Sequence, residues 1–108
     1  MTAGWSTQLS ETLTIAWSEH SGGEMDRGTS ALAHWHVAGI LAESQADALR
    51  QAVRLRLDHQ PVVGVVGRAA VVQALQQRVA GICAELGFEL QALELRLEHG
   101  YSVQWQRG

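Results

Sequence analysis

The C-terminal residues from Phe88 to Trp105 constrain the fold most, because only one hairpin loop length gathers their apolar side chains on one face. A two-residue loop at His99-Gly100 would place Leu95 opposite Gln104 and mix polar and apolar groups on both faces. A three-residue loop from Glu98 to Gly100 instead gives these pairs: Leu97 with Tyr101, Leu95 with Val103, and Leu93 with Trp105. We therefore predict a β-hairpin with Gly100 left-handed in a bulge. A slip of the apolar phase between Ala92 and Leu93 predicts a second bulge there.

Alternating residues in the N-terminal part predict two antiparallel strands. The first strand runs to Ser18. Its apolar positions are separated mostly by Ser, Thr and Ala, and they are Leu9, Leu13, Ile15 and Trp17. A polar, glycine-punctuated loop over residues 19–29 follows, and residues 31–41 form the second strand.

Two helices are predicted in the middle of the chain. Ser44 is the expected N-cap of the first, which runs to about His59 before Pro61. The alternation over residues 53–57 would also suit a strand, but the cap and the length favour a helix. The second helix is expected over residues 69–86, with Gly87 as its stop. Its stripe consists of Val71, Leu75, Val79, Ile82, Cys83 and Leu86.

The segment from Val62 to Gly67 is apolar on both faces, as a central parallel strand would be. The predicted fold is therefore a single α/β domain over residues 1–108, with a mixed five-stranded sheet. Its order is strand-strand-helix-strand-helix-strand-strand. Right-handed crossovers advancing in one direction put both helices on one face, which makes a two-layer sandwich.

The second sheet face is also expected to be apolar, because Leu32, Ala38 and Ile40 oppose the other apolar residues of the second strand. Burial of one such side chain is worth about 1.5–3 kcal/mol, so this face needs a cover. The candidates are another subunit, a partner protein, or a doubly wound arrangement with a helix on each side. We expect at least a homodimer, with Trp35, Val37 and Trp105 as interface residues.

Composition narrows the class of protein. The net charge is −3 and the Arg residues are scattered, so no broad basic face for nucleic acid is expected. Cys83 is the sole cysteine, which fits a reducing cytoplasm. Neither a signal peptide nor a membrane-spanning apolar run is recognisable. The absence of Lys and Asn suggests a GC-rich bacterial coding bias.

His34 and His36 form the most suggestive motif, because strand alternation puts both imidazoles on one side, roughly 7 Å apart. That spacing can chelate a transition metal, with His20, or Glu24 or Asp26 in the loop, as a third ligand. Alternating histidines on a half-exposed strand also occur without any metal.

A second candidate site is the turn of Gly64, Gly67 and Arg68, where a parallel strand enters a helix. Helix N-termini attract anions, and an Arg side chain can clamp a phosphate or carboxylate. The segment is neither a dinucleotide fingerprint nor a P-loop, and glycine in a tight turn is its ordinary explanation.

No nucleophile, catalytic set or cofactor motif stands out in the sequence. The leading hypothesis is therefore a small non-catalytic assembly, adaptor or regulatory subunit that associates through its sheet and needs no cofactor. The alternative is a small-ligand, anion or metal-binding protein, enzymatic or not, that uses His34 and His36 or the turn at Gly67-Arg68. Bound metal in the purified protein would discriminate between the two.

Overall fold

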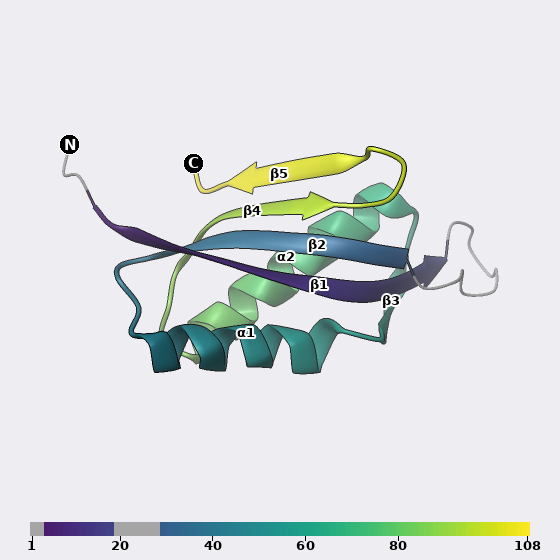
Figure 1. Ribbon diagram of the computed structural model, residues 1–108. Helices are drawn as coiled ribbons and strands as arrows, with labels where there is room; N and C mark the ends of the chain where they lie inside the picture. Colours follow the sequence, from purple (N-terminus) through teal and green to yellow (C-terminus); the bar gives the residue numbers. More distant parts are fainter. Residues whose placement is uncertain (1–3, 19–28) are drawn as a thin grey trace.

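The computed structural model describes residues 4–18 and 29–108, which form one mixed sheet and two helices (Figure 1). The elements are β1 (Ser6–Ser18), β2 (Thr29–Ala38), α1 (Glu43–Leu57), β3 (Gln60–Val66), α2 (Arg68–Glu85), β4 (Leu90–Arg96) and β5 (Ser102–Gln106). The strands lie in the order β3-β1-β2-β4-β5; β3 is parallel to β1, and every other neighbouring pair is antiparallel. This confirms the predicted fold class and element order.

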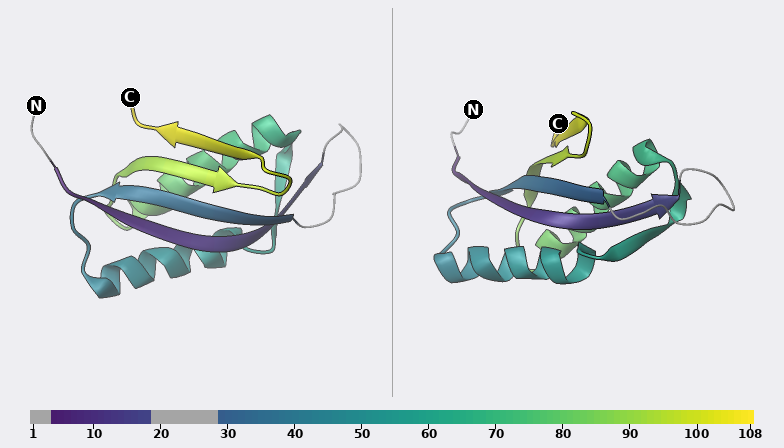
Figure 2. Two further views of the ribbon diagram at one scale, coloured as in Figure 1. Left: turned by 45° about the horizontal axis from the view of Figure 1, so that its top comes forward. Right: turned by 45° about the vertical axis from the view of Figure 1, so that its right-hand side comes forward.

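Both helices pack on the same face of the curled sheet, as the two further views in Figure 2 show. The doubly wound alternative is therefore wrong. Side chains of β1 and β2 alternate between the two sides of the sheet, so every second one points toward the helices. We call this side the covered face; its buried strand residues include Leu9, Leu13, Ile15, Trp17, Ala31, Ala33, Trp35, Val37, Leu93 and Leu95. They pack against apolar residues of both helices, among them Leu49, Val53, Leu75 and Val79.

The opposite side, which we call the open face, is covered by no described element. It carries Gln8, Ser10 and Thr12 of β1, Leu32, His34 and His36 of β2, Glu94 and Arg96 of β4, and Gln104 and Gln106 of β5. The expectation of an apolar second face is wrong, because Leu32 is the one large apolar side chain in this set. Ile40 lies beyond the end of β2 and is 72% exposed.

The strand β3 lies at the edge of the sheet, which corrects the prediction of a central strand. It pairs with β1 only near its ends, through Gln60, Pro61 and Val66, and Gly64 between them has φ +86°. Pro61 has no N–H to donate and so suits an edge. The valines that suggested burial on both faces are divided: Val62 is buried, whereas Val63 is 63% exposed.

The first helix begins earlier than predicted, after Ala42 and not after Ser44. The side chain of Gln45 accepts a hydrogen bond from the N–H of Ala42 (2.8 Å), which stabilises this earlier start. The helix ends at Leu57, before the predicted His59, because two bonds fasten the next residues to β1. Asp58 accepts a hydrogen bond from the N–H of Thr14 (2.7 Å), and the N–H of His59 donates to the carbonyl of Thr14 (2.9 Å).

No helix within residues 4–18 and 29–108 combines the length and apolar character that crossing a membrane requires.

The C-terminal hairpin has the predicted register: Leu93 pairs with Trp105 and Leu95 with Val103. The N–H of Leu97 donates to the carbonyl of Tyr101 (2.7 Å), and Gly100 has φ +74°, as expected. His99 also has a positive φ, +62°. The register shift in β4 lies opposite His36 and Val37, so Gln91 is the extra residue, slightly before the predicted position.

Candidate functional site

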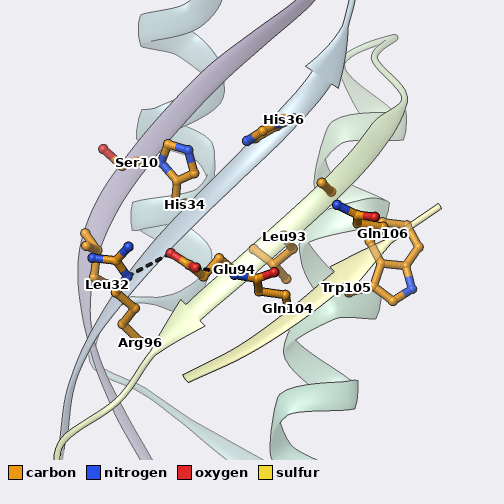
Figure 3. A pocket seen from close by; sticks show the side chains of 11 residues that line it. Ser10, Leu32, His34, His36, Leu93, Glu94, Arg96, Gln104, Trp105 and Gln106 are labelled. Atoms are coloured by element: carbon orange, nitrogen blue, oxygen red, sulfur yellow. Dashed lines mark hydrogen bonds and ion pairs between the residues drawn. The ribbon is translucent and has the colours of Figure 1, made fainter. Parts of the chain in front are cut away.

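A shallow basin of about 380 Å³ lies on the open face, across β1, β2, β4 and β5 (Figure 3). Strand alternation produces it, because the intervening side chains point into the core and leave the polar ones outside. Its polar lining includes Ser10, His34, His36, Glu94, Arg96 and Gln104. The basin therefore gathers ionisable and amide groups that lie far apart in the sequence.

The two imidazoles of β2 lie side by side in this basin. Their ring centroids are 5.2 Å apart and the rings meet edge to face at 83°. The Nε2–H of His34 donates to Oε1 of Gln8 (3.2 Å). In a neutral imidazole this tautomer leaves Nδ1 of His34 as a hydrogen-bond acceptor. The side chain between the two histidines, Trp35, points the other way and is fully buried.

Glu94 lies opposite His34 in the β2–β4 ladder and is held by one side chain from β5 and one from β4 itself. One carboxylate oxygen accepts a hydrogen bond from Nε2 of Gln104 (2.7 Å), and the other accepts one from Nε of Arg96 (2.7 Å). The hydrogen bond from Gln104 and then the contacts with Arg96 and the nearby His34 lower the pKa of the Glu94 carboxyl below its usual value. Glu94 is thus a fixed, ionised acceptor beside the imidazole pair.

The predicted third metal ligand, His20, lies outside the described residues, as do Glu24 and Asp26. Ser10 pairs with His34, and Ser18, the last described residue before His20, lies roughly 26 Å further along β1 at about 3.3 Å per residue. Within the described ranges no three His, Cys, Asp or Glu side chains converge closely enough to hold a metal ion.

The predicted turn at Gly64, Gly67 and Arg68 lies at the β3 edge and not in the basin. Gly67 caps α2 without a side-chain hydrogen bond, has φ +88°, and donates its own N–H to the carbonyl of Ser18 (2.8 Å). The guanidinium carbon of Arg68 lies 4.4 Å from the centre of the Tyr101 ring. Arg68 thus stacks on the C-terminal hairpin, a contact that holds this side chain in place.

The predicted interface residues are divided between the core and the surface. Trp35 and Val37 are fully buried beneath the helices, whereas Trp105 at the β5 edge is partly exposed and also lines the basin. Cys83 is buried in α2, as expected, and this burial raises the pKa of its thiol to about 11.

Sequence reasoning missed Glu94, Arg96 and Gln104 as site residues. The hairpin register already placed these three on the polar face of the last two strands, so part of the signal was present. The missing step was that β4 pairs with β2, which brings Glu94 opposite His34.

Comparison with known proteins finds a similar fold but no matching family. No family model matches the chain, and no curated protein matches it. Among solved structures it is similar to a 6-pyruvoyl tetrahydropterin synthase of Caenorhabditis elegans, with a TM-score of 0.66 over 96% of each chain and 10% sequence identity. The chain therefore shares its fold with a tetrahydropterin synthase.

Proposed function

We propose that this chain is an enzyme that binds a small, planar, polar heterocycle of the pterin class in the basin on its open face. The observation that carries the proposal is the ionised carboxylate of Glu94, fixed beside two imidazoles on a polar face that no described element covers. Three strands contribute to this arrangement, and the sheet needs none of these side chains for its core.

Each group has a chemical task that suits such a ligand. The Glu94 carboxylate accepts N–H donors, and the imidazole of His34, which is hydrogen-bonded to Gln8, can donate or accept through its ring nitrogens. Imidazole is the side chain most often used to transfer a proton in enzymes, so the pair could act on a bound heterocycle as acid or base. Pterins carry ring N–H, amino and carbonyl groups, which match this set of acceptors and donors.

The size of the basin and the structural neighbour support the same conclusion. Its volume of about 380 Å³ lies within the range of small-molecule sites, roughly 300–1,000 Å³. The similar solved structure is a tetrahydropterin synthase, an enzyme that acts on this class of compound. A non-catalytic adaptor has no comparable support, so we favour the small-ligand alternative over the adaptor hypothesis.

The test is a titration of the purified protein with pterin, in which the fluorescence of the ligand reports binding. We expect saturable binding, and we expect at least a tenfold loss of affinity in Glu94→Gln and in the double variant His34→Gln/His36→Gln. Gln51→Ala, an exposed change on α1, is the control and should bind like the parent protein. No binding to the parent protein, or equal binding by all variants, would contradict the proposal.

A metal site at His34 and His36 is the second candidate, favoured by the side-by-side placement of the two rings. Two imidazoles can hold zinc, nickel or copper and leave coordination positions open for a ligand. Calorimetric titration with nickel tests this candidate separately from pterin binding. Stoichiometric binding that is lost in the double variant but kept in His59→Gln and His99→Gln would support it. Failure of nickel, zinc and copper to bind would exclude it and leave the pterin test unaffected.

A further inference from the structure

A hollow of about 620 Å³ lies between the last turns of the two helices, on the helix side of the sheet and away from the basin. Leu57 and Ile82, which are buried, give it an apolar base, and Leu55 beside them is 80% exposed. Gln60 lines it from the start of β3. Its volume lies within the range of small-molecule sites, roughly 300–1,000 Å³, so the hollow can hold a ligand of its own.

Gly81 lines this hollow from the interior of α2. Its φ is not positive, and a Cβ added there would meet no heavy atom within 4 Å beyond its own stretch of helix. Neither the backbone conformation nor close packing therefore requires glycine at this position. Glycine destabilises the interior of a helix relative to alanine. What the missing side chain provides is open space in the hollow.

Arg78 is the second unusual residue of the hollow. Every other Arg of the described segments lies at most 4.0 Å from a carboxylate or stacks on an aromatic ring. Arg78 is partly buried and has neither partner, although charged side chains that lose water usually gain one. Arg56, which lines the hollow from α1, is neutralised by Glu85 (2.6 Å). Two cations and one carboxylate leave the hollow with one uncompensated positive charge.

We propose that this hollow binds a small monocarboxylate with a compact apolar body. The carboxylate accepts two hydrogen bonds from the guanidinium of Arg78, whose planar fork matches it. The apolar body covers Leu57 and Ile82 and packs against the exposed side chain of Leu55. A phosphate monoester carries roughly 1.5–2 negative charges, more than Arg78 balances, and Glu85 repels the excess. The single free charge therefore favours a carboxylate over a phosphate.

Titration with 3-phenylpropanoate, followed by two-dimensional NMR of the backbone amides, tests the site. We expect saturable shifts at Arg78, Gly81 and Ile82, and we expect them unchanged in the double variant His34→Gln/His36→Gln of the basin. Arg78→Gln should weaken binding at least tenfold, as should replacement of the probe by the neutral 3-phenylpropanamide. Arg54→Gln removes the same charge from α1 outside the hollow and is the matched control. No saturable shifts, shifts centred on the basin, or equal losses in the two Arg variants would overturn the proposal.

Gly81 provides a second test, in which stability and binding should change independently. Gly81→Ala should raise the denaturant midpoint, because alanine favours the helix and nothing lies near the added Cβ. Gly81→Leu should fold, as judged by circular dichroism, and should bind 3-phenylpropanoate at least tenfold more weakly, because its side chain fills the hollow. Ala84→Leu, an exposed change on α2 outside the hollow, should bind like the parent protein. A lower midpoint in Gly81→Ala, or undiminished binding in Gly81→Leu, would contradict the proposal.

Discussion

The two faces of the sheet are made by the same strands yet differ in almost every property. On β2, Trp35 and Val37 are fully buried on the covered face, while His34 and His36 lie on the open face. On β4, Leu93 and Leu95 are buried, while Glu94 and Arg96 face outward and pair with each other. Alternate residues of one strand therefore serve two separate purposes.

This difference indicates where stability and function are located. The covered face holds the buried apolar side chains that drive folding, whereas the open face adds little burial and can carry chemistry without weakening the core. Substitutions on the covered face should therefore change the free energy of unfolding strongly. Substitutions on the open face should change binding and leave stability nearly intact.

The largest effect is expected for Trp35→Ala on the covered face. Removal of this fully buried ring leaves a cavity and should lower the free energy of unfolding by about 3–5 kcal/mol in a denaturant titration. Leu32→Ala, three residues earlier on the open face, is the matched control, and its loss should be about 1 kcal/mol or less. Similar losses for the two variants would contradict the division between the faces.

A pH-dependent effect of up to about 3 kcal/mol is expected from Cys83, whose side chain is buried in the core between α2 and the sheet. Burial raises the pKa of its thiol from 9.0 to about 11, so the folded state keeps its proton where the unfolded state loses it. The stabilising contribution is complete below pH 9 and is lost as the pH rises through 11. Denaturant titrations at pH values from 9 to 11 should show this loss of unfolding free energy. The variant Cys83→Val has no thiol and should not show the part of the loss that the thiol causes.

The turn that joins β4 to β5 should be sensitive to backbone conformation. Gly100→Val should cost about 1–2 kcal/mol of unfolding free energy, because a β-branched residue tolerates φ near +74° poorly. Gly100→Asn should cost clearly less, since Asn enters this region more readily. Equal, negligible losses in denaturant titrations of both variants would mean that the turn does not hold the hairpin.

More of the fold than of the candidate site could be predicted from the sequence, and individual strands and helices show why. Periodicity and turn chemistry identified the element order, the helix side and the pairing of Leu93 with Trp105. The hairpin placed Trp105 opposite Leu93 but did not show that β5 is an edge strand, which leaves this ring partly exposed.

The errors came from long-range pairing, which local patterns do not encode. An apolar valine run resembled a central strand, but among the described strands β3 pairs with β1 alone and lies at the edge of the sheet. The histidine pair was recognised from alternation, whereas Glu94 joined it only through the β2–β4 ladder. Side chains that converge across three strands could not be assembled from their separate positions in the chain.

The double variant His34→Gln/His36→Gln tests the central claim most directly, because one protein sample reports on both faces. Denaturant titration should show an unfolding free energy within about 1 kcal/mol of the parent protein. Titration of the same sample with pterin should show affinity at least tenfold lower. Unchanged pterin affinity, or a loss of stability as large as that of Trp35→Ala, would contradict the assignment of folding to the covered face and binding to the open face.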